Sequence, residues 1–161
     1  MINQLGMKIL QDSEGCELTS YKDEGGVWTI GIGSISYPNG KSVGSNETCT
    51  MDQALEYLNF ELDQKIRSLN TWSMQNKLTF SQNQQSALLC FAYNLGMGPI
   101  IMKGFSLNLA LISGDEQKIR DAFALYVNVN KKFLGITIKK KLPGLVIRRQ
   151  KESDLFFTKD S

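Results

Sequence analysis

The chain has 161 residues, of which 42% are hydrophobic and 21% are charged, and its formal net charge at pH 7 is +2. These values are ordinary for a globular protein, so they exclude a disordered or low-complexity chain, and the length suits one compact domain with room for two lobes. The small net charge gives little attraction for a polyanion, and no basic stripe with interleaved aromatic residues supports a nucleic-acid partner.

Basic residues are concentrated in the last quarter of the chain, most densely over residues 131–151. Two interpretations of this cluster are open. It can be the solvated face of a charged C-terminal region, or it can be a face that docks the anionic polymers of a cell wall.

The chain contains three cysteines, Cys16, Cys49 and Cys90, and no histidine. Their odd number and unrelated spacing match no metal-ligand pattern, so we expect reduced thiols, no metal and no cofactor. The first twelve residues lack the apolar core of a secretory signal, and no later run approaches the ~18 apolar residues of a membrane span. We therefore expect no signal peptide and no stable membrane insertion.

Apolar residues recur at helical spacing from Ile2 to Leu10 and predict an amphipathic helix over about residues 2–13. Glu14 follows at the C-terminal end of this helix. The helix dipole disfavours a negative charge there, which suits a carboxyl group that must hold a proton.

Between about residues 18 and 43 the chain becomes rich in glycine and in β-branched residues. The segment 27–32 reads Val-Trp-Thr-Ile-Gly-Ile, and residues 38–40, Pro-Asn-Gly, are a strong turn signal between two short polar-apolar stretches. We therefore expect a small three-stranded antiparallel sheet.

The remaining chain is predicted to be helical. Thr50 and Gln53 have the spacing of a capping box at the start of a helix over about 51–69. Further helical patterns cover about residues 81–95, 107–112 and 117–127, and Pro143 begins a last helix.

Glu14, Asp23 and Thr29 place two carboxyl groups and a hydroxyl group in one short turn-and-strand region. Cleavage of a glycosidic bond needs a protonated carboxyl for the leaving oxygen and an ionised carboxylate on the other side. The spacing is Glu-x8-Asp-x5-Thr, with Tyr21 before the aspartate and Thr-x-Gly-x-Gly at the end. This stretch closely resembles the catalytic segment of the phage-type lysozymes, the endolysin muramidases of glycoside hydrolase family 24.

Two later segments extend the resemblance over nearly the whole chain. Residues 80–96 are similar to the family's central helix, and residues 142–152 are similar to its Gly-Leu-x-x-Arg-Arg-x-x-Glu terminus. Two positions depart from the pattern: Ser34 stands where the family often has a histidine, and Tyr126, followed by the lysine-rich stretch 131–141, stands where a tryptophan is common.

The resemblance implies a role for each matching residue. Glu14 would be the general acid, Asp23 would be an ionised carboxylate that stabilises the oxocarbenium-like transition state, and Thr29 would help to hold the attacking water. That arrangement is the inverting one. The alternatives without a catalytic role are an exposed helix-end residue for Glu14, a turn residue for Asp23 and an ordinary strand residue for Thr29. The neighbouring carboxyl groups of Glu17 and Glu24 are expected to be dispensable.

Further site residues are also implied. The predicted groove-lining residues are Gly33, Ile35, Tyr93 and Asn108, each with a plain packing role as the alternative. Of Arg148 and Arg149, one is expected to pair with Glu14 and the other to be a solvated helix cation.

The predicted fold is therefore α+β and lysozyme-like, in a single domain over residues 1–161. A small N-terminal lobe would cover about 14–50, a connecting helix about 51–69, and a helical lobe about 70–161 together with the helix 2–13. The glycan would bind in the groove between the lobes.

The implied activity is hydrolysis of the β-1,4 bond between N-acetylmuramic acid and N-acetylglucosamine. We expect a monomeric endolysin, made in the host cytoplasm, that reaches the peptidoglycan glycan strand in the periplasm after a holin opens the membrane. The alternatives are an antibacterial muramidase toxin delivered to rival cells and a catalytically inactive wall-binding module.

Overall fold

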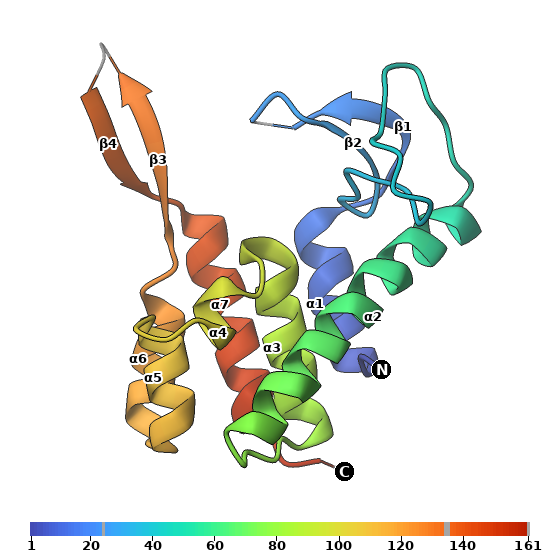
Figure 1. Cartoon of the computed structure of the whole chain (residues 1–161). Helices are drawn as coiled ribbons and strands as arrows, with labels where there is room; N and C mark the ends of the chain where they lie inside the picture. Colours follow the sequence, from blue (N-terminus) through green and yellow to red (C-terminus); the bar gives the residue numbers. More distant parts are fainter. Residues whose placement is uncertain (24, 134–135, 161) are drawn as a thin grey trace.

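The computed structural model describes residues 1–23, 25–133 and 136–160, which form seven helices and two antiparallel strand pairs (Figure 1). The helices are α1 (Gln4–Glu14), α2 (Met51–Gln75), α3 (Gln82–Leu95), α4 (Gly98–Ile101), α5 (Ser106–Ser113), α6 (Glu116–Ala124) and α7 (Pro143–Phe157), and the strands are β1 (Glu17–Lys22), β2 (Trp28–Gly31), β3 (Asn128–Phe133) and β4 (Ile136–Lys141). Among these residues, no helix is both long and apolar enough to cross a membrane. The predicted mixture of helices with a small antiparallel sheet is confirmed.

Helix α3 lies at the centre of the helical part of the molecule. Every side chain from Ser86 to Ala92 is completely buried, as expected for a helix that is apolar on nearly all sides. It packs most extensively against α7 and also contacts α1, α2 and α4. The N-terminal half of the chain is thereby fixed against its last helix, and this places the end of α1 beside α7.

Helix termini follow the local signals in the sequence. The side chain of Asn3 accepts a hydrogen bond from the backbone amide of Gly6 at the start of α1, and Gly15, with φ of 70°, ends it. The predicted capping box of Thr50 is confirmed at the start of α2, and Ser81 forms a second one at the start of α3. Each such cap stabilises a helix by about 0.5–2 kcal/mol. Glu14 is therefore the last helical residue, at a sharply defined chain reversal.

The N-terminal sheet has two strands, so the prediction of three was wrong. β1 pairs with β2 in antiparallel register, with Tyr21 opposite Thr29. Gly31 and Gly33 then adopt φ of 65° and 84°, and the chain turns back so tightly that Ile30 and Ser34 bond to each other. Among residues 32–50, which the structure describes in full, only single bridges form, because left-handed backbone conformations interrupt an extended strand.

The loop that replaces the third strand is organised by Glu47. Its carboxylate accepts hydrogen bonds from the Tyr37 hydroxyl at 2.6 Å, from the Lys41 ammonium at 2.8 Å and from the Gly44 amide at 2.7 Å. The backbone of Glu47 also bonds to Ser20 of β1, through its oxygen and its amide. One side chain thus ties together a loop with little regular structure.

Three elements in the second half of the chain were not predicted. Residues 128–141, which include the lysine-rich stretch, contain the antiparallel pair β3–β4, with Asn128 opposite Lys141. Figure 1 shows this pair projecting from the helices at the same end as β1 and β2, while both chain termini lie toward the other end. Helix α4 was also missed, and α2 extends six residues beyond its predicted end at 69.

The contacts of Glu47 predict a pH-dependent contribution to stability. The Gly44 amide, then Lys41 and Tyr37, lower the pKa of Glu47 from 4.5 to about 2. A carboxyl group with a lowered pKa stabilises the fold above its unfolded pKa and loses that effect as the pH falls through its folded pKa. Glu47→Gln should therefore lower the thermal midpoint at pH 7, and the difference from the unchanged protein should shrink between about pH 4.5 and pH 2. Glu56→Gln, at an exposed position of α2, is the control, and a difference for Glu47→Gln that does not change with pH would contradict this account.

Candidate active site

A cavity of about 890 Å³ opens where the end of α1, the turn after β1 and the start of α7 meet. It brings together Glu14 and Asp23, the two carboxyl groups singled out by their spacing. Its other lining residues are Asp12, Ser13, Tyr21, Gly25, Asn94, Leu142, Pro143, Gly144, Leu145, Ile147, Arg148 and Lys151. Residues from both ends of the chain therefore build one site.

Glu14 is held at this cavity by two different neighbours. Its Oε1 accepts a charge-assisted hydrogen bond from Nη1 of Arg148 at 2.5 Å, and its side chain is 20% exposed. Its Oε2 lies against Gly33, where an added Cβ would come within 3.4 Å of it. Gly33 also has a left-handed φ of 84°. A side chain at this position would be strained and would press on the carboxyl group.

Arg148 is itself fixed by two further contacts. Its Nε donates to Oε1 of Glu152 at 3.0 Å, and its Nη2 donates to the backbone oxygen of Cys90 at 3.2 Å. Glu152 also forms an ion pair with Arg149, at 2.9 Å, and both of these side chains are almost fully buried. The guanidinium group that contacts Glu14 therefore has little freedom to move.

The expectation that one of the two arginines is a solvated cation was wrong. Arg148 and Arg149 are 5% and 2% exposed. Arg149 donates to Asn94 at 3.0 Å, and its guanidinium carbon lies 4.7 Å from the centre of the Phe91 ring. Arg148 alone makes the contact with Glu14 that the resemblance implied for one of the pair.

Burial and charge act against each other in this network. Burial by itself would lower the pKa of Arg148, but Glu14 and Glu152 outweigh it and raise that pKa. Burial raises the pKa of Glu152 to about 7, while Arg149 and Arg148 oppose the rise. The ion pairs of Glu152 with Arg148, at 3.0 Å, and with Arg149, at 2.9 Å, favour the ionised form of Glu152, because a buried carboxylate needs compensating charge.

Asp23 stabilises a turn and also lines the cavity. Its Oδ1 accepts hydrogen bonds from the amides of Gly25 and Val27, at 2.8 and 2.9 Å, in an aspartate-centred turn. Both bonds use the same oxygen, so the turn does not require Oδ2. The two interpretations of Asp23, as a turn residue and as a reactive carboxylate, are compatible.

Thr29 lies directly behind this turn. It is 3% exposed, and its hydroxyl donates to the backbone oxygen of Val27 at 3.1 Å, so Val27 connects it to Asp23. Thr29 does not line the cavity. Thr29 is therefore placed to support Asp23 from behind and is not part of the cavity surface.

The predicted groove-lining residues are dispersed. Gly33 and Tyr93 lie behind Glu14, and the Tyr93 hydroxyl donates to the backbone oxygen of Ile32 at 2.6 Å. Ile35 is 51% exposed and lies outside the cavity lining. Asn108 is buried in α5, where its side-chain amide donates to the backbone oxygen of Ile100 at 2.7 Å, so its position is that of a packing residue.

Three residues of the site were not singled out from the sequence. Glu152 is four residues after Arg148 and three after Arg149, the two spacings that place helical side chains on one face. This spacing could have identified it. Tyr21 and Asn94, which line the cavity, lie within the segments that resemble the family, but neither was given a role of its own.

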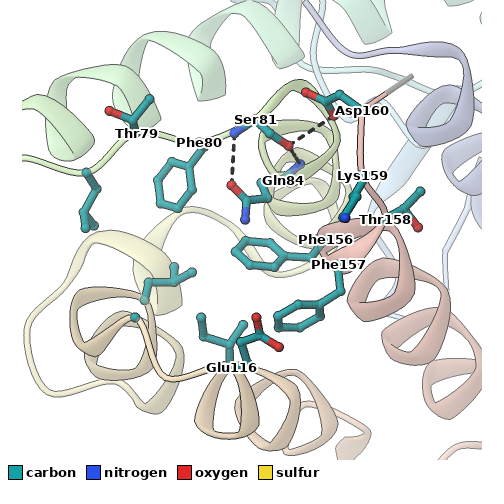
Figure 2. A pocket seen from close by; sticks show the side chains of 14 residues that line it. Thr79, Phe80, Ser81, Gln84, Glu116, Phe156, Phe157, Thr158, Lys159 and Asp160 are labelled. Carbon is teal, nitrogen blue, oxygen red and sulfur yellow. Dashed lines mark hydrogen bonds between the residues drawn. The ribbon is translucent and has the colours of Figure 1, made fainter.

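A second hollow, of about 550 Å³, lies at the opposite end of α7 (Figure 2). Its walls come from the start of α3, the end of α7 and the junction of α5 and α6, with Phe80, Phe156 and Phe157 facing the space. The carboxyl group of Asp160 bonds to the capping Ser81 at its rim. Two carboxyl groups line it, those of Glu116 and Asp160, but the carboxylate of Asp160 is engaged by the Ser81 hydroxyl and by the amides of Gln82 and Asn83 at the start of α3.

The chain matches the family model described as "Phage lysozyme" over residues 11–152, a range that includes Glu14, Asp23, Thr29 and both arginines. The chain belongs to the phage lysozyme family. The endolysin of Acyrthosiphon pisum secondary endosymbiont phage 1 is 29% identical over 157 residues, which cover 96% of this chain and 97% of that protein. The endolysin of Salmonella phage P22 is 26% identical over 162 residues, which cover 98% of this chain and 98% of that protein.

Solved structures show the same relationship. The endolysin from Escherichia coli O157:H7 phage FAHEc1 is 25% identical and superposes with a TM-score of 0.81, over 98% of this chain and 93% of that one. The resemblance to phage-type lysozymes inferred from three motifs is thus confirmed along nearly the whole chain, and the fold is lysozyme-like.

The buried network around Arg148 predicts a large effect on stability. Arg148→Met fills most of the space but leaves Glu152 with one ion pair fewer and Glu14 without a cation. Breaking a buried pair in this way costs about 3–5 kcal/mol of unfolding free energy. Urea denaturation should show such a loss, while Arg67→Met, at an exposed arginine of α2, should change the unfolding free energy by less than about 0.5 kcal/mol. Similar small losses for both variants would show that the network does not stabilise the fold.

Proposed function

We propose that this phage lysozyme is an endolysin muramidase that hydrolyses the β-1,4 bond between N-acetylmuramic acid and N-acetylglucosamine in peptidoglycan. The observation that carries the proposal is the cavity on which Glu14 and Asp23 meet, with Arg148 fixing the carboxyl group of Glu14. A pair of carboxyl groups flanking the scissile bond is the arrangement that glycoside hydrolysis needs.

Glu14 is the general acid in this mechanism. Arg148 donates to its Oε1, so the carboxyl group is oriented through one oxygen while Oε2 is left to carry the proton. As the bond between C1 of the muramic acid and the bridging oxygen breaks, that proton passes to the oxygen, which leaves as the 4-hydroxyl of N-acetylglucosamine.

Asp23 acts on the opposite face of the sugar. It is exposed at the cavity, held by the turn through Oδ1, and its negative charge stabilises the positive charge that develops at C1. Asp23, which Thr29 supports from behind through Val27, holds a water molecule whose oxygen attacks C1, and the carboxylate of Asp23 receives the proton that the water releases. The product has the opposite anomeric configuration to the substrate.

The biological setting that fits this activity is host lysis at the end of a phage cycle. The relatives named above are phage endolysins. We propose that the enzyme is made in the host cytoplasm, acts as a monomer and reaches the wall after a holin opens the membrane. The peptidoglycan glycan strand is then its substrate.

Replacement of the acid tests the proposal most simply. Glu14→Gln keeps the shape and a hydrogen-bond acceptor for Arg148 but has no proton to donate, so release of reducing ends from purified peptidoglycan should fall by at least about 100-fold. Glu17→Gln, at an exposed position of β1, is the matched control and should keep its activity. Substantial turnover by Glu14→Gln, with an unchanged fold by circular dichroism, would rule out Glu14 as the acid.

The stereochemistry of the first product tests the part given to Asp23 and Thr29. Attack by water on the face opposite Glu14 should yield the α-anomer first, and NMR of freshly released products can detect it before mutarotation. A retaining enzyme would instead form a covalent intermediate with a carboxylate about 5–5.5 Å from the acid and release the β-anomer. Immediate appearance of the β-anomer would therefore contradict the inverting assignment.

A further inference from the structure

A second group of polar side chains lies behind the turn against which Glu14 rests. It consists of Ser34 after β2, Glu61 and Lys65 on α2, and Tyr93 on α3, and we call it the rear cluster. None of these four residues lines the cavity that contains Glu14 and Asp23. The mechanism above therefore gives the rear cluster no direct contact with substrate.

Tyr93 connects the rear cluster to the turn. Its hydroxyl donates to the backbone oxygen of Ile32 at 2.6 Å, and its ring edge would be 3.5 Å from a Cβ built on Gly33. The same Cβ would be 3.4 Å from Oε2 of Glu14. The backbone of Gly33 is thus enclosed between the phenol ring and the catalytic acid, so a shift of Tyr93 changes the surface against which Glu14 rests.

The other contacts of the rear cluster involve Glu61, Lys65 and Ser34. Oε2 of Glu61 is 3.6 Å from the ammonium nitrogen of Lys65, which itself lies 5.3 Å from the centre of the Tyr93 ring. Oε1 of Glu61 and Oγ of Ser34 are both buried and form no well-aligned hydrogen bond. Native proteins contain few such atoms, and these two are complementary, since a hydroxyl donates and a carboxyl oxygen accepts.

The position of the Ser34 hydroxyl makes it the connection between Glu61 and Tyr93. It lies close enough to both groups to lower the pKa of each. Burial nevertheless raises the pKa of Glu61 and of Tyr93, so the phenol keeps its proton and remains the donor to Ile32. A small rotation would direct the single proton of the Ser34 hydroxyl to Oε1 of Glu61, with the Ser34 oxygen beside the phenol of Tyr93, whose own proton goes to Ile32.

We propose that Glu61 is a positioning residue for the catalytic acid: acting through Ser34 and Tyr93, it holds the Gly33 turn against Glu14. The proposal rests on the muramidase activity proposed above and extends it to a residue outside the cavity. It also gives Ser34 a function at a position where the family often has a histidine. The rear cluster then acts on the chemical step, because it fixes the acid and does not contact the sugar.

Substitutions of Glu61 can separate hydrogen bonding from charge. Glu61→Ala removes the acceptor for Ser34, so kcat on peptidoglycan should fall by about 10-fold while KM changes by less than about twofold, since misplaced catalytic groups lower the rate of the chemical step. Glu61→Gln loses the ion pair with Lys65 but keeps an amide oxygen for Ser34, so it should retain kcat within about threefold. Asp63→Ala, at an exposed position of the same helix, is the control.

Tyr93→Phe provides an independent variant that keeps the ring and removes only the bond to Ile32. It should lower kcat by a similar factor, and the double variant Glu61→Ala/Tyr93→Phe should be little worse than either single one, because residues that act as a unit are not additive. Thermal midpoints of all variants are measured to confirm that each is folded at the assay temperature.

The outcomes distinguish this inference from the proposed function. Unchanged kcat in both Glu61→Ala and Tyr93→Phe would overturn the inference while the muramidase assignment stands. An equal fall in Glu61→Gln and Glu61→Ala would also overturn it, because charge and not the hydrogen-bonded chain would then be responsible. Absence of activity in the unchanged protein and in Asp63→Ala would instead overturn the proposed function, and the inference with it.

Discussion

The buried ion pairs that join Glu14, Arg148 and Glu152 are the constraint on which the site depends. Glu14 ends α1 near the start of the chain, and Arg148 lies on α7 near its end. Their contact at 2.5 Å forms only if α1 and α7 both pack correctly against α3. The fold therefore has to be complete before the acid is oriented, which links activity to the integrity of the helical core.

The same network carries an energetic cost that the core must offset. Three nearly buried charged side chains, Arg148, Arg149 and Glu152, have been removed from water, and ion pairs of this kind contribute little or no net stability. Their value lies in geometry, since a guanidinium group with several fixed partners holds a carboxyl oxygen in one place. Burial of apolar residues around α3 supplies the stability that permits this arrangement.

Much of the fold and part of the site could be predicted from local sequence signals. The capping box at Thr50 and the turn at residues 38–40 are local features, and the structure has both. The third strand was predicted wrongly, because the left-handed conformations of Gly31 and Gly33 break it and their effect depends on packing. The strand pair within 128–141 was missed, because the lysine-rich stretch was interpreted through its charge, as a solvated or a docking face, and not through strand pairing.

The site residues also fall into two groups: those that a local sequence pattern identifies and those that only long-range packing brings to the site. Glu14 and Asp23 share a spacing within one short segment, so the sequence identifies them together. The choice between Arg148 and Arg149 depends on which side of α7 faces Glu14, and adjacent positions in a helix point in directions about 100° apart. Long-range packing decided that choice, as it did for Glu61, which nothing in its own segment marks as a neighbour of the acid.

The central claim is that water attacks C1 of N-acetylmuramic acid after Glu14 protonates the leaving oxygen. Mass spectrometry of sugars released from purified peptidoglycan in water enriched in oxygen-18 tests it most directly. The account predicts fragments whose new reducing end is N-acetylmuramic acid carrying one atom of oxygen-18 from the solvent. Fragments that end in N-acetylglucosamine, or in an anhydro-muramic acid without solvent oxygen, would contradict it.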